Sequence, residues 1–150
     1  MPDCLDPKQS PLYYNAGMKV FQIQGDWSLA HLQLATRPDP RPGPGEVLLR
    51  MQAASLNYRD LLVPARGYGA HTGTLPLIPL SDGVGEVVEA GAGVTRVRAG
   101  DRVCPCFVQG WIDGPRDGTH LTLGGPIDGT MAEYMVLPEG GVVKAPACLA

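Results

Sequence analysis

The sequence predicts a single, mainly β domain, a barrel or sandwich of short strands joined by turns. Its 150 residues are the length of one domain, and apolar residues make up 44% of it, which is enough for a hydrophobic core. The 20 glycines and 15 prolines recur without a period, and neither residue suits the interior of a helix. Long helices are therefore excluded over most of the chain, and short alternating runs between Gly and Pro indicate strands.

The first two of these strands are predicted to form a hairpin. The run MKVFQIQ from Met18 alternates apolar and polar residues, as a half-buried strand does. A Gly-Asp turn follows, and a second alternating run at 29–36 places Leu32 and Leu34 on one face. Residues 1–17, which precede the hairpin, are expected to form a flexible extension.

A proline-rich loop, a strand and one short helix come next. Residues 38–45 hold four prolines and two glycines, which exclude both a helix and a central strand. The apolar run EVLLRMQAAS that follows is a predicted strand. A helix is predicted around 56–63, with Ser55 as its N-cap and with Leu61 and Leu62 facing inward.

Three further strands complete the prediction. Each is a short apolar run flanked by Gly or Pro, and they lie at 84–90, 101–107 and 130–137. Many strands of this length, separated by turns at regular intervals, are typical of a β-barrel or a β-sandwich.

The composition excludes several classes of partner. The net charge of −3, from 12 basic and 15 acidic side chains, leaves no basic face for nucleic acid. No apolar run reaches the roughly 18–20 residues of a membrane span, and the first residues lack the apolar centre of a signal peptide. The four cysteines form no dense framework, so reduced thiols and a cytoplasmic location are expected.

The segment SDGVGEVVEAGAGVTRVRAGDRV, residues 81–103, is the most specific stretch of the chain. It resembles the N-terminal, GroES-like domain of medium-chain dehydrogenases/reductases, in which a pattern of the type GHEGAGxVxxVGxxVxxxxxGDRV is usual. The run AASLNYRDLLV lies at the family's catalytic lip, and GTMAEYMVLPEGGVVKAPACL resembles its closing strands. The resemblance covers residues 18–150 and implies a GroES-like, partly open β-barrel with one or two short helices. In a full family enzyme, an α/β Rossmann domain would follow.

The resemblance also implies that the chain binds no zinc. Zinc-dependent members use a lip Cys and the His of GHE as ligands of the catalytic metal, and these positions align with Asn57 and Ser81. Neither an amide nor a hydroxyl is a competent anchor for zinc. The structural zinc lobe of some relatives needs four close cysteines, whereas only Cys104 and Cys106 lie in that region. The sequence is therefore identified as a member of the zinc-free, quinone-oxidoreductase-like branch.

The lip supplies the candidate site. By resemblance it faces the nicotinamide of the cofactor, so Asn57, Tyr58 and Asp60 are the candidate catalytic residues. Asn57 would hydrogen-bond the cofactor, Tyr58 would donate its hydroxyl proton to a substrate carbonyl, and Arg59 would approach a cofactor phosphate. Without the resemblance, Asn57 reads as a helix cap and the Arg-Asp pair reads as solvated surface.

Gln109 and Trp111 are candidates for lining a substrate pocket. They belong to the Gly-rich stretch at 107–129, whose length suggests a surface excursion beside the cleft. A buried Trp that anchors this loop is the simpler alternative. Asp82 is either a supporting residue of the site or a partner for backbone N–H groups in a turn.

The sequence contains no dinucleotide-binding fingerprint, because its G-x-G pairs never continue to a third glycine that opens a helix after a strand. We therefore expect the substrate-side domain of an NAD(P)(H)-dependent oxidoreductase, with the cofactor held mainly by another domain. It would move hydride to or from a quinone, enone, aldehyde or alcohol. The 150 residues alone would be inactive, and a full-length form could be a homodimer. The alternative is a stand-alone, non-catalytic module that acts through protein–protein contacts.

Overall fold

The computed structural model describes residues 17–69, 72–115 and 118–148, and it confirms the predicted mainly β architecture with one short helix. The predicted extension at 1–17 lies outside the described residues except for Gly17. In chain order the strands and the α-helix are β1 (Met18–Ile23), β2 (Leu32–Arg37), β3 (Glu46–Ser55), α1 (Arg59–Leu62), β4 (Asp82–Ala90), β5 (Arg102–Pro105), β6 (Val108–Gln109), β7 (Leu121–Thr122), β8 (Tyr134–Pro138) and β9 (Val142–Lys144). Short 3₁₀ helices at Leu29–His31 and Glu139–Gly141 precede β2 and β9.

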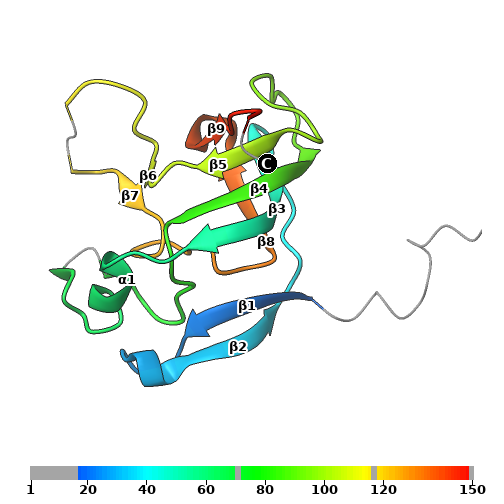
Figure 1. The fold of residues 1–150 in the computed structure, drawn as a ribbon. Coiled ribbons are helices and arrows are strands. Elements are labelled where there is room, and N and C mark those ends of the chain that lie inside the picture. The colour runs from blue at the N-terminus through cyan, green and yellow to red at the C-terminus, as the bar shows by residue number, and fades with distance from the viewer. Residues whose placement is uncertain (1–16, 70–71, 116–117, 149–150) are drawn as a thin grey trace, which may run out of the picture.

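A curled sheet of five antiparallel strands forms a half-barrel (Figure 1). The strand order is β8-β3-β4-β5-β9, so the ten-residue strand β3 lies between β8 and β4. β3 begins opposite the end of β8, where Glu46 pairs with Pro138. At its other end, Ser55 pairs with Asp82. This register brings the end of β3 beside the start of β4, which is where the predicted lip lies.

β1 and β2 form the predicted antiparallel hairpin, a separate two-stranded sheet drawn below the half-barrel in Figure 1. β1 supplies its inward face, because Met18 and Val20 are buried and pack with Ile78. β2 is the outer strand. The face of β2 that carries Leu34 points outward, since 60% of this residue is exposed.

The core of the half-barrel is an apolar cluster drawn from the strand interiors. Val47, Leu49 and Val87, from β3 and β4, are fully buried. Burying one such side chain completely contributes about 1.5–3 kcal/mol. The other buried members of the cluster are Val97, Val103, Leu123, Met135, Leu137 and Val142.

Two predicted strands are shorter in the structure. The run at 130–137 divides between two sheets, because the Phe21 N–H of β1 donates to the Met131 carbonyl at 2.9 Å before β8 begins at Tyr134. This change of partner ties the hairpin to the half-barrel. The run at 101–107 shortens to β5 because its pairing changes after Pro105: the Cys106 N–H still donates to the Gly141 carbonyl at 2.8 Å, whereas the Phe107 carbonyl accepts the Leu123 N–H at 3.1 Å.

The predicted helix begins later than expected. Ser55 is the last residue of β3 and does not cap α1. The Asp60 carboxylate instead accepts the backbone N–H of Asn57 at 2.8 Å, and this bond closes the turn that leads into the helix. The inward-facing prediction is wrong for Leu61, which is 54% exposed, whereas Leu62 is half-buried. Asp60 is the buried residue of α1.

Candidate functional site

The predicted lip lies where β3 ends and β4 begins, beside α1 at the left of Figure 1. The Asn57 side chain donates from Nδ2 to the Asp82 carboxylate. The Ser81 hydroxyl donates to the same Asp82 oxygen at 3.1 Å, and the Thr130 hydroxyl donates to the Asp82 backbone carbonyl at 3.0 Å. Asp82 therefore orients the Asn57 amide, and its role as a supporting residue of the site stays a prediction. Within the described residues, the Asn57 Oδ1 has no hydrogen-bond donor.

Asp60 fixes the backbone of the lip through two hydrogen bonds to Asn57. Its carboxylate accepts the Asn57 N–H at 2.8 Å, and its own N–H donates to the Asn57 carbonyl at 3.0 Å. Burial raises the pKa of the Asp60 carboxyl above its ordinary value. The Asn57 N–H bond and the positive charge of Arg59 oppose that rise in pKa, and the negative charge of Asp82 adds to it.

The buried carboxyl predicts a pH dependence of folding. A carboxyl whose pKa is raised by folding binds more protons in the native than in the unfolded state, so its contribution to stability falls as the pH rises through the raised pKa. Asp60→Asn keeps an oxygen for the Asn57 N–H but cannot ionise. We expect this variant to gain stability relative to the parent chain as the pH rises from about 4 to 7.

Urea unfolding at several pH values measures this difference, and Asp101→Asn is the matched control. The Lys144 ammonium, 2.9 Å from the Asp101 carboxylate, lowers the pKa of Asp101. The Asp101 contribution to stability is therefore present at neutral pH and lost on acidification, so the control should lose stability relative to the parent as the pH rises. A trend of the same sign for both variants would contradict the assignment for Asp60.

Tyr58 stands at the outer edge of the lip. Its backbone is the N-terminal flank of α1, with helical φ and ψ, and 74% of the residue is exposed. Among the described residues, none accepts a hydrogen bond from its hydroxyl. The side chain is therefore presented outward beside Asn57, and its hydroxyl is able to reach a ligand.

Arg59 points away from this exposed edge, toward the turn at 122–125. Its Nη1 donates to the Leu123 carbonyl at 2.9 Å. Its Nη2 donates to the Thr122 hydroxyl at 3.3 Å and to the Gly125 carbonyl. The cofactor-phosphate role of Arg59 stays a prediction, and the contacts of the guanidinium favour a different role.

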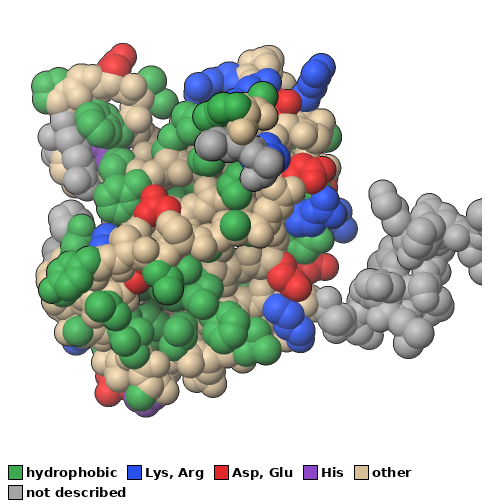
Figure 2. All heavy atoms as spheres, in the orientation of Figure 1, with side chains coloured by type: hydrophobic (Ala, Val, Ile, Leu, Met, Phe, Trp, Pro, Cys, Tyr) green, Lys and Arg blue, Asp and Glu red, His purple; other side chains and the backbone are tan. Residues whose placement is uncertain are grey.

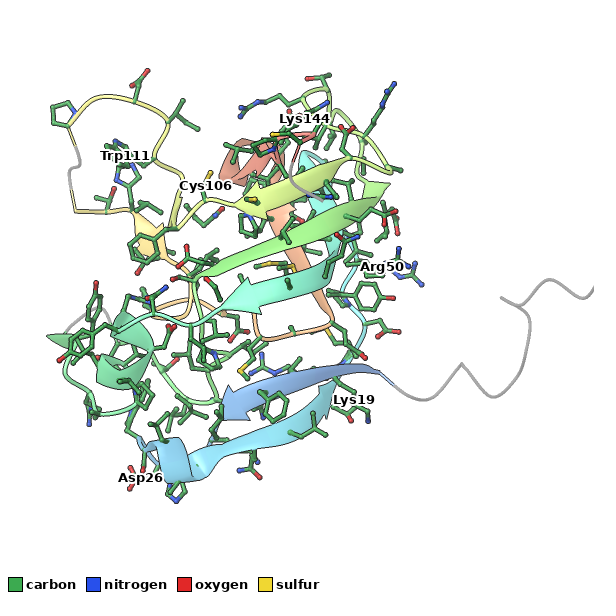
Figure 3. All side chains as sticks on the ribbon, in the orientation of Figure 1. Lys19, Asp26, Arg50, Cys106, Trp111 and Lys144 are labelled. Carbon is green, nitrogen blue, oxygen red and sulfur yellow. The ribbon has the colours of Figure 1, made fainter. Side chains whose placement is uncertain are left out.

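The structure does not bring Gln109 and Trp111 to the lip residues. Gln109 is buried, and its Nε2 donates to the carbonyls of Cys106 and Gly141 at 2.6 and 3.1 Å. Trp111 lies on the loop between β6 and β7 (Figure 3), where its Nε1 donates to the Gly114 carbonyl at 3.0 Å. The expectation of a buried Trp anchor is wrong, because Trp111 is 45% exposed. Their role in a substrate pocket stays a prediction.

The donor set at the lip does not fit a tetrahedral zinc ion. Such sites use Cys thiolates, His nitrogens and carboxylates, at least three of them from the protein. Asn57, Ser81 and Asp82 offer an amide, a hydroxyl and one carboxylate, and these groups bond one another. Nowhere in the described part of the chain do three or more His, Cys, Asp or Glu side chains gather as a metal site would require. Burial raises the pKa of the Cys106 thiol, which disfavours the thiolate that a metal needs.

A hollow of about 530 Å³ lies elsewhere on the surface, between β1 and β3. Lys19, Arg50, Glu133 and Tyr134 are among its lining residues, and Figure 3 labels the first two. None of its lining residues belongs to the lip, so it supplies no wall for the predicted site. In the described part of the chain, no helix has the length and apolar character needed to cross a bilayer.

Known proteins share both the sequence pattern and the fold. Residues 43–147 match the family model of the alcohol dehydrogenase GroES-like domain. A zinc-type alcohol dehydrogenase-like protein of Schizosaccharomyces pombe is 44% identical over 105 residues, which cover 69% of this chain and 30% of the relative. The structure of an NAD-dependent alcohol dehydrogenase is similar with a TM-score of 0.78 and 31% identity, over 89% of this chain and 41% of that one. The structure of a quinone oxidoreductase of Pseudomonas syringae pv. Tomato is similar with a TM-score of 0.67 and 28% identity, over 89% of this chain and 35% of that one.

The chain spans about a third of the length of its Schizosaccharomyces pombe relative, so the matches concern one domain. Because that relative is named as zinc-type, the comparisons define the family and leave the zinc-free branch as a proposal. The family model covers well over half of the residues, and the half-barrel with its lip helix is the fold of that family. The chain therefore belongs to the alcohol dehydrogenase GroES-like domain family, as a relative of NAD-dependent medium-chain alcohol dehydrogenases.

Proposed function

We propose that this chain is the substrate-side domain of an NAD(P)(H)-dependent oxidoreductase that works without a catalytic zinc. The reaction is hydride transfer to or from a quinone, enone, aldehyde or alcohol. The observation that carries the proposal is the pair formed by Asn57 and Asp82, an oriented amide at the exposed lip of an alcohol dehydrogenase GroES-like domain. The quinone oxidoreductase of similar fold supports the choice of substrate classes.

The nicotinamide cofactor, when bound, supplies or accepts the hydride. The residues of this chain bind, orient and polarise. Asp82 holds one N–H of the Asn57 amide, which leaves Oδ1 and the second N–H of Asn57 for the cofactor's amide or ribose. Tyr58 holds a proton at its hydroxyl oxygen and donates that hydrogen bond to the substrate carbonyl, where negative charge develops. Asp60 keeps the Asn57 backbone in place.

Zinc independence follows from the same groups. In a zinc enzyme the metal polarises the substrate oxygen as a Lewis acid. Here the two aligned ligand positions are Asn57 and Ser81, and both are donors to one carboxylate. The Tyr58 hydroxyl takes over the polarising role. The Schizosaccharomyces pombe relative is a zinc-type protein by name, whereas the residues at the aligned ligand positions of this chain support a zinc-independent reaction.

The second candidate, a non-catalytic binding module, draws on exposed apolar side chains. Leu34, Leu56 and Leu61 are 60%, 79% and 54% exposed, and Figure 2 shows hydrophobic side chains gathered over α1 and the β1–β2 hairpin on the face in view. Such a surface suits contact with another domain or another chain. The oxidoreductase hypothesis is favoured because it also accounts for the hydrogen-bonded polar side chains of the lip, Asn57, Ser81 and Asp82.

Deuterium transfer tests the proposed function. A full-length form that carries a dinucleotide-binding domain is incubated with NAD(P)H deuterated at the transferring position, and with an enone or an aldehyde. We expect deuterium bound to carbon in the product, measured by mass spectrometry. A full-length protein that binds the cofactor but transfers deuterium to none of the substrate classes would refute the proposal and favour the binding module.

A further inference from the structure

The lip helix α1 is too short to hold its own position. It covers four residues, and isolated helices shorter than about 12–15 residues are marginal in water. Tyr58, at its N-terminal flank, makes no side-chain cap bond. Asn57 and Tyr58 are nevertheless exposed groups that need a fixed direction to meet a ligand productively. The contacts that fix the helix must therefore come from outside it.

Arg59 makes such contacts with both terminal nitrogens and with the face of its guanidinium group. The hydrogen bonds of its two terminal nitrogens reach the turn at 122–125, as described above. The guanidinium carbon also lies 4.6 Å from the centre of the Tyr68 ring and 5.0 Å from that of Phe107. Both distances are within the range of cation–π attraction, which is stronger where water is excluded. One side chain thus joins α1 to three other segments.

The turn at 122–125, which accepts the hydrogen bonds of Arg59, packs against the core and also against the segment that leads into Ser81 and Asp82. Leu123 is 1% exposed and belongs to the main core cluster. Gly124 has φ of +69° and lies so close to Leu80 that a Cβ there would be 2.6 Å from the Leu80 carbonyl oxygen. Leu80 directly precedes Ser81, and it is a non-glycine residue with φ of +69°. The turn is therefore a common anchor for both halves of the site.

We infer that Arg59 is the positioning residue of the lip, which sets the direction of Asn57 and Tyr58 by clamping α1 onto the turn at 122–125. A lysine cannot replace it, because an ammonium lacks the planar fork that reaches several carbonyls while lying over two rings. The contacts of Arg59 fix the geometry of the lip in the chain by itself. Its consequence for hydride transfer rests on the proposed function.

Two measurements on Arg59→Lys test the inference. In the 150-residue chain labelled with ¹⁵N, the side-chain amide signals of Asn57 report its bond to Asp82. We expect the two amide proton shifts to move toward the values of a free amide, and the Asp60 N–H to exchange with solvent at least about tenfold faster. In a full-length form we expect kcat to fall at least about tenfold at saturating substrate and cofactor.

Arg37→Lys is the matched control, because Arg37 also bridges distant segments, with bonds of 2.6 Å to Asp128 and Gln22, but touches no lip residue. It should leave the Asn57 signals and kcat unchanged. Thr122→Val removes one hydrogen-bond acceptor of Arg59 and replaces no residue of the lip. It should shift the Asn57 signals in the same direction as Arg59→Lys, and it replaces that variant if Arg59→Lys does not fold. Unchanged Asn57 signals in both Arg59→Lys and Thr122→Val would overturn the inference. Absence of turnover in the full-length parent would refute only the proposed function.

Discussion

Tyr58→Phe is expected to slow hydride transfer in a full-length enzyme by roughly 30- to 1000-fold. The substitution removes only the hydroxyl group, which the proposed function places on the substrate carbonyl. A hydrogen bond to an oxygen on which charge develops contributes about 2–4 kcal/mol in the transition state, and this energy gives the expected range of rates. Because Tyr58 is 74% exposed and its hydroxyl bonds no described residue, the melting temperature should stay unchanged.

Single-turnover kinetics with saturating cofactor measure this rate directly. Tyr134→Phe is the control, since Tyr134 lies on β8 at the hollow shared with Met18 and Arg50 and not at the lip. The control should keep the parent rate. A Tyr58→Phe enzyme with full activity would remove the hydroxyl from the mechanism, and an active enzyme with a lowered melting temperature would assign Tyr58 to structure.

Gly129→Ala is expected to cost about 3 kcal/mol or more of the free energy of unfolding. A Cβ at this position would lie 1.8 Å from the carbonyl oxygen of Leu80 and 2.5 Å from that of Pro79. Overpacking typically costs about 1–3 kcal/mol, and the upper end applies because the obstructing atoms belong to backbone rather than to a side chain that can rotate. The Gly129 N–H also donates to the Ile78 carbonyl at 2.8 Å, so the backbone cannot retreat without losing that bond.

Urea denaturation measures the change, with Gly140→Ala as the control. The nearest atom to a Cβ at Gly140 would be the end of the Ile112 side chain at 3.4 Å, which is an ordinary contact. The control should change the free energy of unfolding by no more than about 0.5 kcal/mol. Equal stability of the two variants would mean that the approach of Gly129 to the segment before Ser81 is looser than the structure describes.

The strands were predictable because their signals are local. Alternation in the run from Met18 and the turn after it specify the hairpin. The glycines of the specific segment at 81–103 allow a close approach at the start of β4, since Cβ atoms at Gly83 and Gly85 would lie 2.8 and 2.9 Å from carbonyl oxygens of β3. The start of the helix was predicted wrongly because the Asp60 carboxylate accepts the Asn57 N–H. A carboxylate that follows the turn competes with Ser55, which precedes the turn, for the free N–H groups there.

The supporting contacts of the lip were beyond sequence reasoning. The bond from Asn57 to Asp82 joins residues 25 positions apart, and it depends on the register between β3 and β4. The acceptors of Arg59 are mostly backbone carbonyls, which carry no signature in the side-chain sequence. Trp111 bonds a backbone carbonyl of its own loop, that of Gly114, and no residue pattern specifies that local contact.

The metal content of the active enzyme tests the central claim most directly. A full-length form is purified, its turnover of NAD(P)H is recorded, and zinc is measured by elemental analysis before and after dialysis against a chelator. Because Asn57 and Ser81 are the residues that the resemblance aligns with the two zinc ligands, and both donate to Asp82, we predict far less than one zinc per chain and an unchanged kcat after dialysis. Close to one zinc per chain, lost together with turnover and restored with it, would contradict the account.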